Sequence, residues 1–338
     1  MRELKFVFAG VAHVHSHGYA MSLKELKEAR LVGVYDHSPE RAKIFGQKYG
    51  ATAYENLEEM FRRERPDAVI VASENARHAE LAVKTMENGI HILCEKPITT
   101  TLEDAKRVVS AARRAGVVFQ TCFVMRYHSA TLTVKELLEA GAIGEIRAIL
   151  GTNRLNVNSI LVEPWFTDPG LSGGGAIMDH TAHLADIMRW YTGSEIESIY
   201  TETGANIIPN IRVEDNFLTI ARFRGNKLCS IDGSWCFPDT YPSWGEFTLT
   251  IYGSDGMIAV DAFRQNVAQL SFKNTEGGGR LHYYSSDPNL EMIKDFVKCI
   301  IDPSHKPRAT AEDGYRATEA TVASYMSARE GRPVALPL

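Results

Sequence analysis

Four consecutive residues, Cys94-Glu95-Lys96-Pro97, place a lysine and a carboxylate where an apolar segment ends. The segment Ile90–Leu93 is typical of a buried strand, and ligands of open α/β sheets bind at the carboxyl ends of the strands. The proline fixes the backbone directly after the lysine. Lys96 is therefore a candidate for chemistry, and the alternative is a surface lysine in a turn.

A second candidate group lies at Ser172–Asp186, where glycines 173–175 precede a helical pattern. Asp179 and His183 are four residues apart, so on a helix they share a face. The carboxylate can hold one imidazole nitrogen and leave the other to exchange protons, which is the arrangement of a general base. The glycines would let a substrate or cofactor approach the start of the helix closely. The alternative is a solvated aspartate beside a core histidine.

The third candidate is the predicted strand-to-helix turn that begins at Gly10. A dinucleotide-binding turn carries glycines at G-x-G-x-x-G spacing, and here Ala12 and His15 replace the second and third. We expect His15 to push the helix away or to turn outward. Asp36 ends the next predicted strand, 26 residues after Gly10, near the spacing of the acid that binds the adenosine ribose. An acid there favours NAD over NADP, and a helix cap before Pro39 is the alternative.

Polar residues also follow the predicted strand Ala68–Ala72, namely Glu74, Asn75 and His78. The carboxyl ends of parallel strands meet at one crevice, so these residues should lie with the turn, the aspartate and the lysine described above. An ordinary helix cap at Asn75 and an exposed helix position for His78 are the alternatives.

The spacing of apolar residues predicts how these groups are positioned. Up to residue 123, strand-like and helix-like segments alternate, which indicates right-handed βαβ crossovers and a doubly wound parallel sheet. Many sheets of this kind bind nucleotides, but the fold alone does not establish that function. The predicted strands are 6–10, 31–35, 68–72, 90–93 and 117–121, and the helices are 16–28, 39–49, 57–65, 76–88 and 101–115.

The pattern changes after residue 123, where strands follow one another without helices between them. This predicts a mostly antiparallel sheet in a second domain. We therefore divide the chain into domains at 1–123 and 124–338. Thr310 and Asp313 indicate a capping box at the start of the last helix. The predicted helices are 131–140, 175–191 and 310–329, and the strands are 196–203, 215–223, 227–236, 246–252 and 257–261.

Composition excludes several classes of partner. The net charge of −5 and pI near 6.1 give no positive surface for nucleic acid or an anionic membrane. The five cysteines are scattered, without the spacing of a zinc site or a disulfide framework, which favours a reducing, cytoplasmic location. The apolar segment near the N-terminus is too short for a signal peptide or a membrane span, so we expect a soluble, unexported protein.

The ordered set of motifs resembles the glucose-fructose oxidoreductase, inositol dehydrogenase and MocA (Gfo/Idh/MocA) family over nearly the whole chain. The resemblance implies a Rossmann domain, an α/β domain with a large open sheet that often serves oligomerisation, and NAD(P)-dependent oxidation or reduction of sugars and cyclitols. A homodimer or homotetramer would follow. The motifs are the degenerate turn, Asp36, Glu74-Asn75-x-x-His78, Glu95-Lys96-Pro97, Met125-Arg126-Tyr127 and Trp165-x-x-Asp168-Pro169-x-x-Ser172-Gly173-Gly174-Gly175-x-x-x-Asp179-x-x-x-His183.

The resemblance also implies roles by position. Lys96 would bind and polarise the reacting oxygen, His183 would be the general acid/base, and Asp179 would bind substrate and tune the pair. The substrate pocket would include Arg126, Tyr127, Asn153, Trp165, Asp179 and His180, with Arg154 and Phe166 as further residues that set specificity. The cofactor, expected to be NAD, would contact Gly10, Ala12, His13, Val14, Asp36, His37, Ser73, Asn75, His78, Glu95 and Lys96.

The chain departs from the family pattern at several positions. Glu74 stands where the family often has proline, Thr181 replaces a common glycine, and His180 occupies a usually apolar position. His180 and His183, together with His13, His15 and His17, give an unusual number of imidazoles near the crevice. Asp179 adds a carboxylate. Imidazole with carboxylate is metal-ligand chemistry, although we assign no metal.

Two other function classes remain open. The pair His13-x-His15 after the first strand resembles the opening of metal-dependent amidohydrolase barrels, but a barrel needs eight βα units and the alternation stops near residue 123. A non-catalytic protein that senses a sugar or nucleotide could keep the same fold. The presence of Lys96, Asp179 and His183 together favours an enzyme, because a sensor needs no group for proton transfer.

Overall fold

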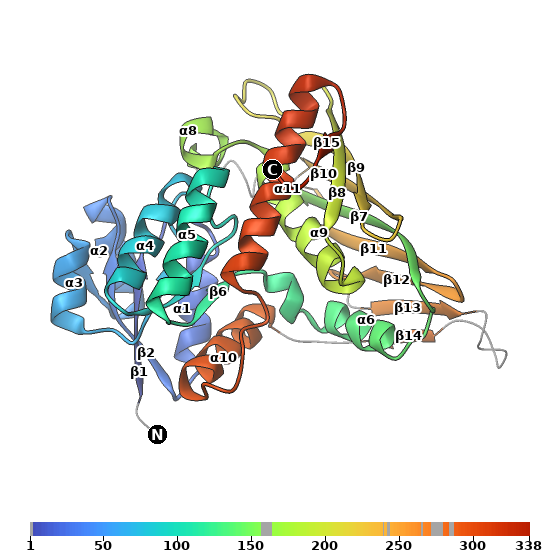
Figure 1. Ribbon diagram of the computed structural model, residues 1–338. Coiled ribbons are helices and arrows are strands. Elements are labelled where there is room, and N and C mark those ends of the chain that lie inside the picture. Colours follow the sequence, from blue (N-terminus) through green and yellow to red (C-terminus); the bar gives the residue numbers. More distant parts are fainter. Residues whose placement is uncertain are drawn as a thin grey trace. The chain divides into compact units, whose positions relative to one another are not determined.

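The computed structural model describes residues 3–156, 164–238, 240–241, 244–264, 266–271, 280–283 and 287–338 (Figure 1). Within these, the chain forms two compact units. The first comprises Met1–Val124, Gly170–Gly173 and Asp287–Thr318, and the second Met125–Pro169, Gly174–Ser286 and Glu319–Leu338. The sequence-based division places residues 287–318 in the second domain. They belong to the first unit because α10 (Pro288–Ile301) packs against α1 (Ser16–Lys24).

The first unit is built on a six-stranded sheet whose neighbouring strands are all parallel. Its strands are β1 (Leu4–Ala9), β2 (Ala29–Tyr35), β3 (Thr52–Tyr54), β4 (Ala68–Val71), β5 (His91–Cys94) and β6 (Phe119–Thr121). The order β3-β2-β1-β4-β5-β6 runs from β1 to one edge and then to the other, so the predicted doubly wound sheet is confirmed. Nearly all residues of β1 and β4 are buried, as expected where helices cover both faces.

The sequence sets the ends of the connecting helices. The side chains of Ser38 and Thr101 cap α2 and α5 by accepting hydrogen bonds from backbone N–H groups of the first turn. Gly50 and Gly116 end the same two helices in the left-handed conformation. The bounds of these helices are α2 (Pro39–Tyr49), α3 (Leu57–Glu64), α4 (His78–Glu87) and α5 (Leu102–Ala115).

The second unit contains a nine-stranded sheet, and the only parallel pair among its described strands joins β7 and β10. The predicted large, mostly antiparallel sheet is confirmed. The strand order is β14-β13-β12-β11-β7-β10-β9-β8-β15. The strands are β7 (Ile146–Asn156), β8 (Ile196–Thr203), β9 (Asn216–Phe223), β10 (Lys227–Phe237), β11 (Gly245–Gly253), β12 (Gly256–Asp261), β13 (Asn266–Ser271), β14 (Arg280–Tyr283) and β15 (Val334–Ala335).

Helices cover one face of this sheet. Helix α9 (Ala176–Thr192) packs on β7, β9 and β10, and α6 (Ser129–Glu139) packs on β12, β13 and β14. Helix α11 (Ala311–Glu330) begins with the expected capping box, in which the Thr310 backbone N–H donates to Asp313 and the Asp313 N–H donates to Thr310. Short helical turns lie at η1 (Asn75–Arg77), η2 (Val124–Tyr127), η3 (Pro164–Thr167) and α8 (Pro169–Ser172).

Several of the observed elements are absent from the sequence prediction. Strand β7, at the centre of the second sheet, is not predicted, nor are β3, β13, β14, β15 and α10.

The described strands form two open sheets, which excludes the closed barrel of a metal-dependent amidohydrolase. Among the described residues, no helix is both long and apolar enough to cross a membrane.

A buried ion pair joins η2 to α9 within the second unit. The Arg126 guanidinium donates from Nε to Asp186 Oδ2 at 2.7 Å and from Nη2 to Oδ1 at 2.6 Å. Arg126 is 3% exposed and Asp186 is fully buried. The bidentate geometry compensates for the removal of both charges from water, so each partner depends on the other.

We expect Asp186→Asn to lower the free energy of unfolding by about 3–5 kcal/mol, because it leaves the Arg126 charge buried without its carboxylate. Urea titration followed by intrinsic fluorescence measures the loss. The matched control is Asp232→Asn, which breaks the half-exposed pair between Asp232 and Arg154 and should cost only about 0–1 kcal/mol. Equal losses in the two variants would contradict this account.

Candidate active site

The carboxyl ends of four strands of the first unit lie in one row. Ala9 pairs with both Tyr35 and Val71, and Val71 pairs with Cys94. The residues that follow these positions therefore leave the sheet at the same edge. We call this edge, made of residues 10–15, 36–41, 72–78 and 95–97, the carboxyl edge.

Close packing at the carboxyl edge requires Gly10. Its φ of +83° lies in the left-handed region, and a Cβ atom there would lie 2.3 Å from Cβ of Ser73. The turn after Gly10 is tied to both neighbouring strand ends. The backbone N–H of Val11 donates to Asp36 Oδ2 at 2.8 Å, and that of His13 donates to the Ala72 carbonyl at 2.9 Å.

The start of α1 has the properties of an anion site. This nine-residue helix has no side-chain cap at His15 and no acidic residue in its first turn. Its N-terminal partial positive charge is therefore not neutralised from within the helix. The tight turn at Gly10, buried Ala12 and half-buried Val14 precede it, so the residues present fit the pyrophosphate of a dinucleotide.

The side chain of His15, which replaces the third glycine, does not turn outward but contacts a buried carboxylate. Its Nδ1 lies 2.7 Å from Oε1 of Glu95, which also accepts a hydrogen bond from the Tyr19 hydroxyl. The sequence analysis does not single out Tyr19, although its spacing of four from His15 is the signal that it shares a helix face. The backbone N–H of Lys96 donates to Glu95 Oε2 at 2.6 Å, so both carboxylate oxygens are engaged.

These contacts keep Glu95 ionised. Burial alone would raise the pKa of Glu95, but the imidazoles of His13 and His15 and the Lys96 ammonium hold it well below its ordinary value. Burial, together with the nearby Cys122 and Glu95, raises the pKa of Tyr19 well above its ordinary value, so the phenol remains a donor. The anionic carboxylate thus fixes the backbone on which Lys96 stands.

His78 holds two segments of the carboxyl edge together. Its Nδ1 lies 2.8 Å from the Pro97 carbonyl oxygen and its Nε2 lies 3.0 Å from the Ser73 carbonyl oxygen. The side chain is fully buried, and burial lowers the pKa of His78. These ring contacts position the segment that carries Lys96, which is itself 2% exposed. The expected contact of His78 with the cofactor stays a prediction.

The end of β2 carries the expected ribose-binding acid. The two oxygens of Asp36 accept hydrogen bonds from the N–H groups of Val11 and Ser38, both at 2.8 Å, and Asp36 is 1% exposed. The buried Asn75 Oδ1 has no hydrogen-bond donor among the described residues, so a hydroxyl group of a nucleotide would satisfy it. The Nδ2 of Asn75 donates to the Ser172 carbonyl.

In the second unit, α9 carries the expected acid/base residues. Asp179 Oδ2 accepts a hydrogen bond from Trp235 Nε1 at 3.2 Å, and His183 is 9% exposed. His180 is almost fully buried, with its ring edge toward Trp235 and its Nδ1 3.7 Å from Asp179. The Asp179 carboxylate is therefore fixed by a residue of β10.

The expected substrate residues are placed differently from one another. Asn153 is buried on the face of β7 that α9 covers, and Tyr127 is also buried. Trp165 stacks on Phe166 with ring centroids 4.1 Å apart. Two of the expected residues have carboxylate partners within the second unit, and their substrate roles stay predictions. The Arg126 guanidinium is engaged by Asp186, and Arg154 lies on the opposite face of β7, paired with Asp232, because alternate residues of a strand face opposite sides.

The imidazoles at the start of the chain do not form one cluster. His17 is not part of the group formed by His13 and His15. Its Nδ1 lies 2.8 Å from the Tyr49 hydroxyl on α2. His13, His15 and Glu95 have possible ligand atoms within 4.8 Å of one another. The Glu95 oxygens already accept hydrogen bonds from His15, Tyr19 and Lys96, so this group functions as a hydrogen-bond network.

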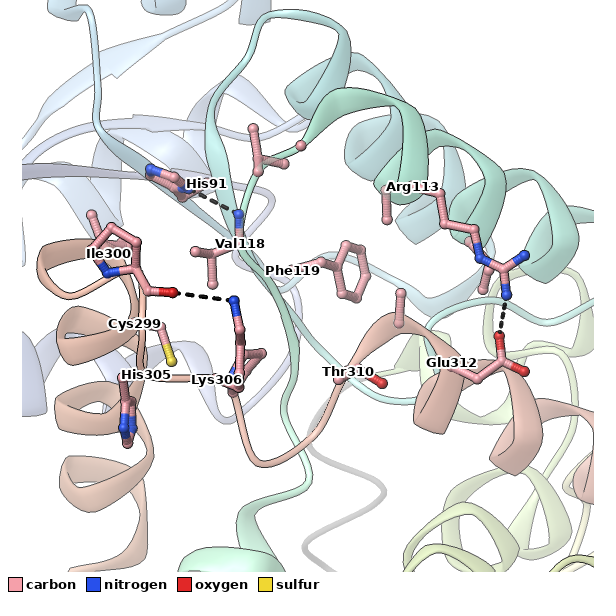
Figure 2. A pocket seen from close by; sticks show the side chains of 17 residues that line it. His91, Arg113, Val118, Phe119, Cys299, Ile300, His305, Lys306, Thr310 and Glu312 are labelled. Atoms are coloured by element: carbon pink, nitrogen blue, oxygen red, sulfur yellow. Dashed lines mark hydrogen bonds and ion pairs between the residues drawn. The ribbon is translucent and has the colours of Figure 1, made fainter.

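A cavity of about 510 Å³ lies elsewhere in the first unit, beside β6 and α10 (Figure 2). His91 begins β5 and Phe119 begins β6, so this cavity is at the amino ends of the strands and away from the carboxyl edge. Cys299 and His305 line it, and with Asp295 they form a second group of possible ligand atoms within 4.8 Å. The sequence analysis does not single out this group, because α10 is not predicted.

A parallel doubly wound sheet with a glycine turn, a buried aspartate after β2 and a lysine at its carboxyl edge is typical of dinucleotide-binding proteins. Two family models match the chain: residues 4–123 match the oxidoreductase family with an NAD-binding Rossmann fold, and residues 131–259 match the GFO/IDH/MocA C-terminal domain. The chain belongs to the Gfo/Idh/MocA family of oxidoreductases.

Known proteins resemble the chain over nearly its whole length. Myo-inositol 2-dehydrogenase from Thermotoga maritima is 27% identical over 330 residues, which is 94% of each chain. A levoglucosan dehydrogenase solved with NADH and levoglucosan has a TM-score of 0.89 at 21% identity and covers 100% of both chains. A structure described as an NADPH-dependent oxidoreductase from Desulfitobacterium hafniense has a TM-score of 0.86 at 20% identity. The match covers 99% of this chain and 98% of the other. The structures share the fold.

Glu214 fixes the start of α9, although the sequence analysis does not identify it. Its Oε1 accepts hydrogen bonds from the N–H groups of Gly175 and Ile177, both at 3.0 Å, and from the Tyr325 hydroxyl at 2.7 Å. A Cβ on Gly175 would lie 1.9 Å from the Glu214 carbonyl oxygen, so glycine is required there. The cap comes from residues distant in sequence, and no side chain at the start of the helix supplies it.

We expect Glu214→Ala to lower the free energy of unfolding by about 1–2 kcal/mol, because it leaves N–H groups at the start of α9 without an acceptor. The same urea titration measures the change. Glu214→Gln keeps an acceptor oxygen and should lose less. A Glu214→Ala protein as stable as the wild type would contradict the assignment of the cap.

The pH dependence of the same residue has a defined sign. Burial raises the pKa of Glu214 above its ordinary value of 4.5, so folding favours its protonated form. The stability linked to this proton is complete below pH 4.5 and is lost as the pH rises through the pKa of the folded protein. The melting temperature of the wild type should therefore fall relative to that of Glu214→Gln as the pH is raised from below 4.5 to neutral. A constant difference would contradict this linkage.

Proposed function

We propose that the protein transfers hydride between NAD and a secondary alcohol or ketone of a sugar, sugar derivative or cyclitol. The observation that carries the proposal is the row formed by Ala9, Tyr35, Val71 and Cys94, which places the turn, Asp36 and Lys96 at one edge. The similarity to myo-inositol 2-dehydrogenase supports the substrate class.

The side chains have the types that this chemistry needs. Bound NAD supplies the acceptor or donor of the hydride. As hydride leaves an alcohol carbon, the hydroxyl proton must be taken up and the negative charge on oxygen stabilised. Lys96 binds and polarises that oxygen, His183 exchanges the proton, and Asp179, held by Trp235, stabilises the protonated imidazole and binds substrate.

The proposed cofactor is NAD in preference to NADP. Asp36 has both oxygens fixed by backbone N–H groups, so its charge stays at the position expected for the ribose hydroxyls. A hydroxyl can donate to this carboxylate, whereas a 2′-phosphate would be repelled by it. The proposed cytoplasmic location is supported by the five cysteines, all of which are free thiols.

We also propose that the open face of the second sheet binds a second copy of the chain, giving a homodimer or homotetramer. Leu218 and Ile220 of β9 are 62% and 52% exposed. Ser230 pairs with Ile220 on one side and with Leu150 on the other, so these apolar side chains lie in one row of the sheet. Leu150, Leu228 and Tyr252 extend the exposed apolar surface across β7, β10 and β11. Apolar surface of this extent is typical of an interface.

We expect Lys96→Ala and His183→Ala each to lower kcat by about 10²–10⁴-fold, because each removes a group that acts on the reacting oxygen. NADH formation with a panel of cyclitols, sugars and polyols measures turnover. Lys43→Ala, at an exposed lysine of α2, is the control and should match the wild type. Activity close to that of the wild type in either variant would contradict the roles assigned here. NADH binding without turnover on any substrate would favour the sensor alternative.

The oligomer prediction has its own test. Leu218→Lys combined with Ile220→Lys should shift the mass measured by light scattering to that of one chain, because two charges would be buried in the interface. The control is Ile44→Lys, which places a lysine at a 59% exposed apolar site of the first unit and should leave the mass unchanged. A wild-type mass equal to one chain would contradict the proposed interface.

A further inference from the structure

Four charged side chains of the first unit gather where the ribose of a dinucleotide is expected. Arg41 Nη1 lies 3.1 Å from Glu74 Oε1 and 3.4 Å from Asp36 Oδ1. Arg77 Nε lies 3.5 Å from the other oxygen of Glu74. His37 Nε2 lies 3.2 Å from Glu74 Oε1. We call Asp36, Arg41, Glu74 and Arg77 the ribose-edge cluster.

Glu74 is the centre of this cluster. It is 2% exposed, and every cation of the cluster contacts it. A carboxylate so deeply buried requires compensation by opposite charge. Arg41 is bound most closely, while a third of its side chain remains exposed. Glu74 therefore restricts the cation nearest to Asp36.

Cofactor choice depends on the charge available to a 2′-phosphate. Arginine is the residue best suited to binding that group, because its fork of N–H donors matches phosphate oxygens. Arg41 lies at the correct strand end for this task, but Glu74 and Asp36 already engage it. With two acids and two arginines, the cluster has no net charge to offset a phosphate, counting Asp36 and Glu74 as −1 each and Arg41 and Arg77 as +1 each.

We propose that Glu74 is a second determinant of cofactor specificity, which excludes NADP by holding Arg41 in an ion pair. This inference rests on the proposed function, and it concerns a residue that contacts none of the reacting atoms. Asp36 repels the 2′-phosphate directly. Glu74 withholds Arg41, the cation of the cluster that lies beside Asp36 and would otherwise neutralise the phosphate.

The test is Glu74→Gln, which removes the charge and keeps the shape. Fluorescence titration with NADH and NADPH gives two dissociation constants for each protein. We expect the variant to bind NADPH about tenfold more tightly than the wild type, as one new charge-assisted contact would supply, while NADH affinity changes less than about threefold. Glu74→Ser, a smaller uncharged replacement, should give the same direction and serves if Glu74→Gln is poorly folded.

Two controls assign the effect to the ion pair. Adding Arg41→Ala to Glu74→Gln should remove the gain in NADPH affinity, because the freed guanidinium is then absent. Glu80→Gln neutralises an exposed glutamate of α4 that pairs with Lys84 and should change neither dissociation constant. A gain that persists in the double variant would overturn the role of Arg41.

The outcomes separate this inference from the proposed function. If the wild type binds NADH and neither Glu74 variant binds NADPH more tightly, Glu74 does not determine specificity and the proposed function stands. If the folded wild type binds neither NADH nor NADPH, the proposed function fails, and this inference fails with it.

Discussion

The alignment of four parallel strands at their carboxyl ends is the constraint on which the first unit depends. Register puts Ala9, Tyr35, Val71 and Cys94 in one row, and nearly all residues of β1 and β4, at the centre of the sheet, are buried. A slip of one residue in any of these strands would reverse the facing of every side chain in it, so burial specifies the register strongly. Chemistry that is scattered over 85 positions of the sequence, from Gly10 to Glu95, thereby reaches one edge.

A buried carboxylate converts that alignment into a rigid site. Glu95 is fully buried, and an isolated charge there would be costly, so its donors are part of the fold. Those donors come from the turn, from α1 and from the backbone of Lys96. At the position of the third glycine, His15 loses the conformational freedom of glycine but gains a side-chain contact with Glu95. The degenerate turn and the backbone of Lys96 are therefore linked through the Glu95 carboxylate.

Local signals predicted the fold where local physics decides it. The predicted helices 39–49 and 101–115 match α2 and α5 to within one residue, because the caps that end them at Ser38, Thr101 and Gly116 are contacts between near neighbours in sequence. Strand β7 was missed because Gly151 and polar residues interrupt its pattern, and Gly151 is there to admit Leu184 and Met188 of α9. The pairing of Arg126 with Asp186 joins positions 60 residues apart, and no spacing rule reveals such a partner.

The difference between local contacts and contacts distant in sequence explains why a motif alone does not define cofactor choice at the carboxyl edge. Asp36 is identified by its place after β2, and its oxygens are fixed by backbone N–H groups that any sequence would supply. Arg41 is only five residues further on, and its effect depends on Glu74, which follows β4, the strand beyond β1 in the sheet. Electrostatic work at a buried site depends on all charges within a few ångströms, irrespective of their order in the chain. On the proposed role of Glu74, specificity at the carboxyl edge is therefore a property of the charge balance of the ribose-edge cluster, and a single acid identified from the sequence describes only one of its members.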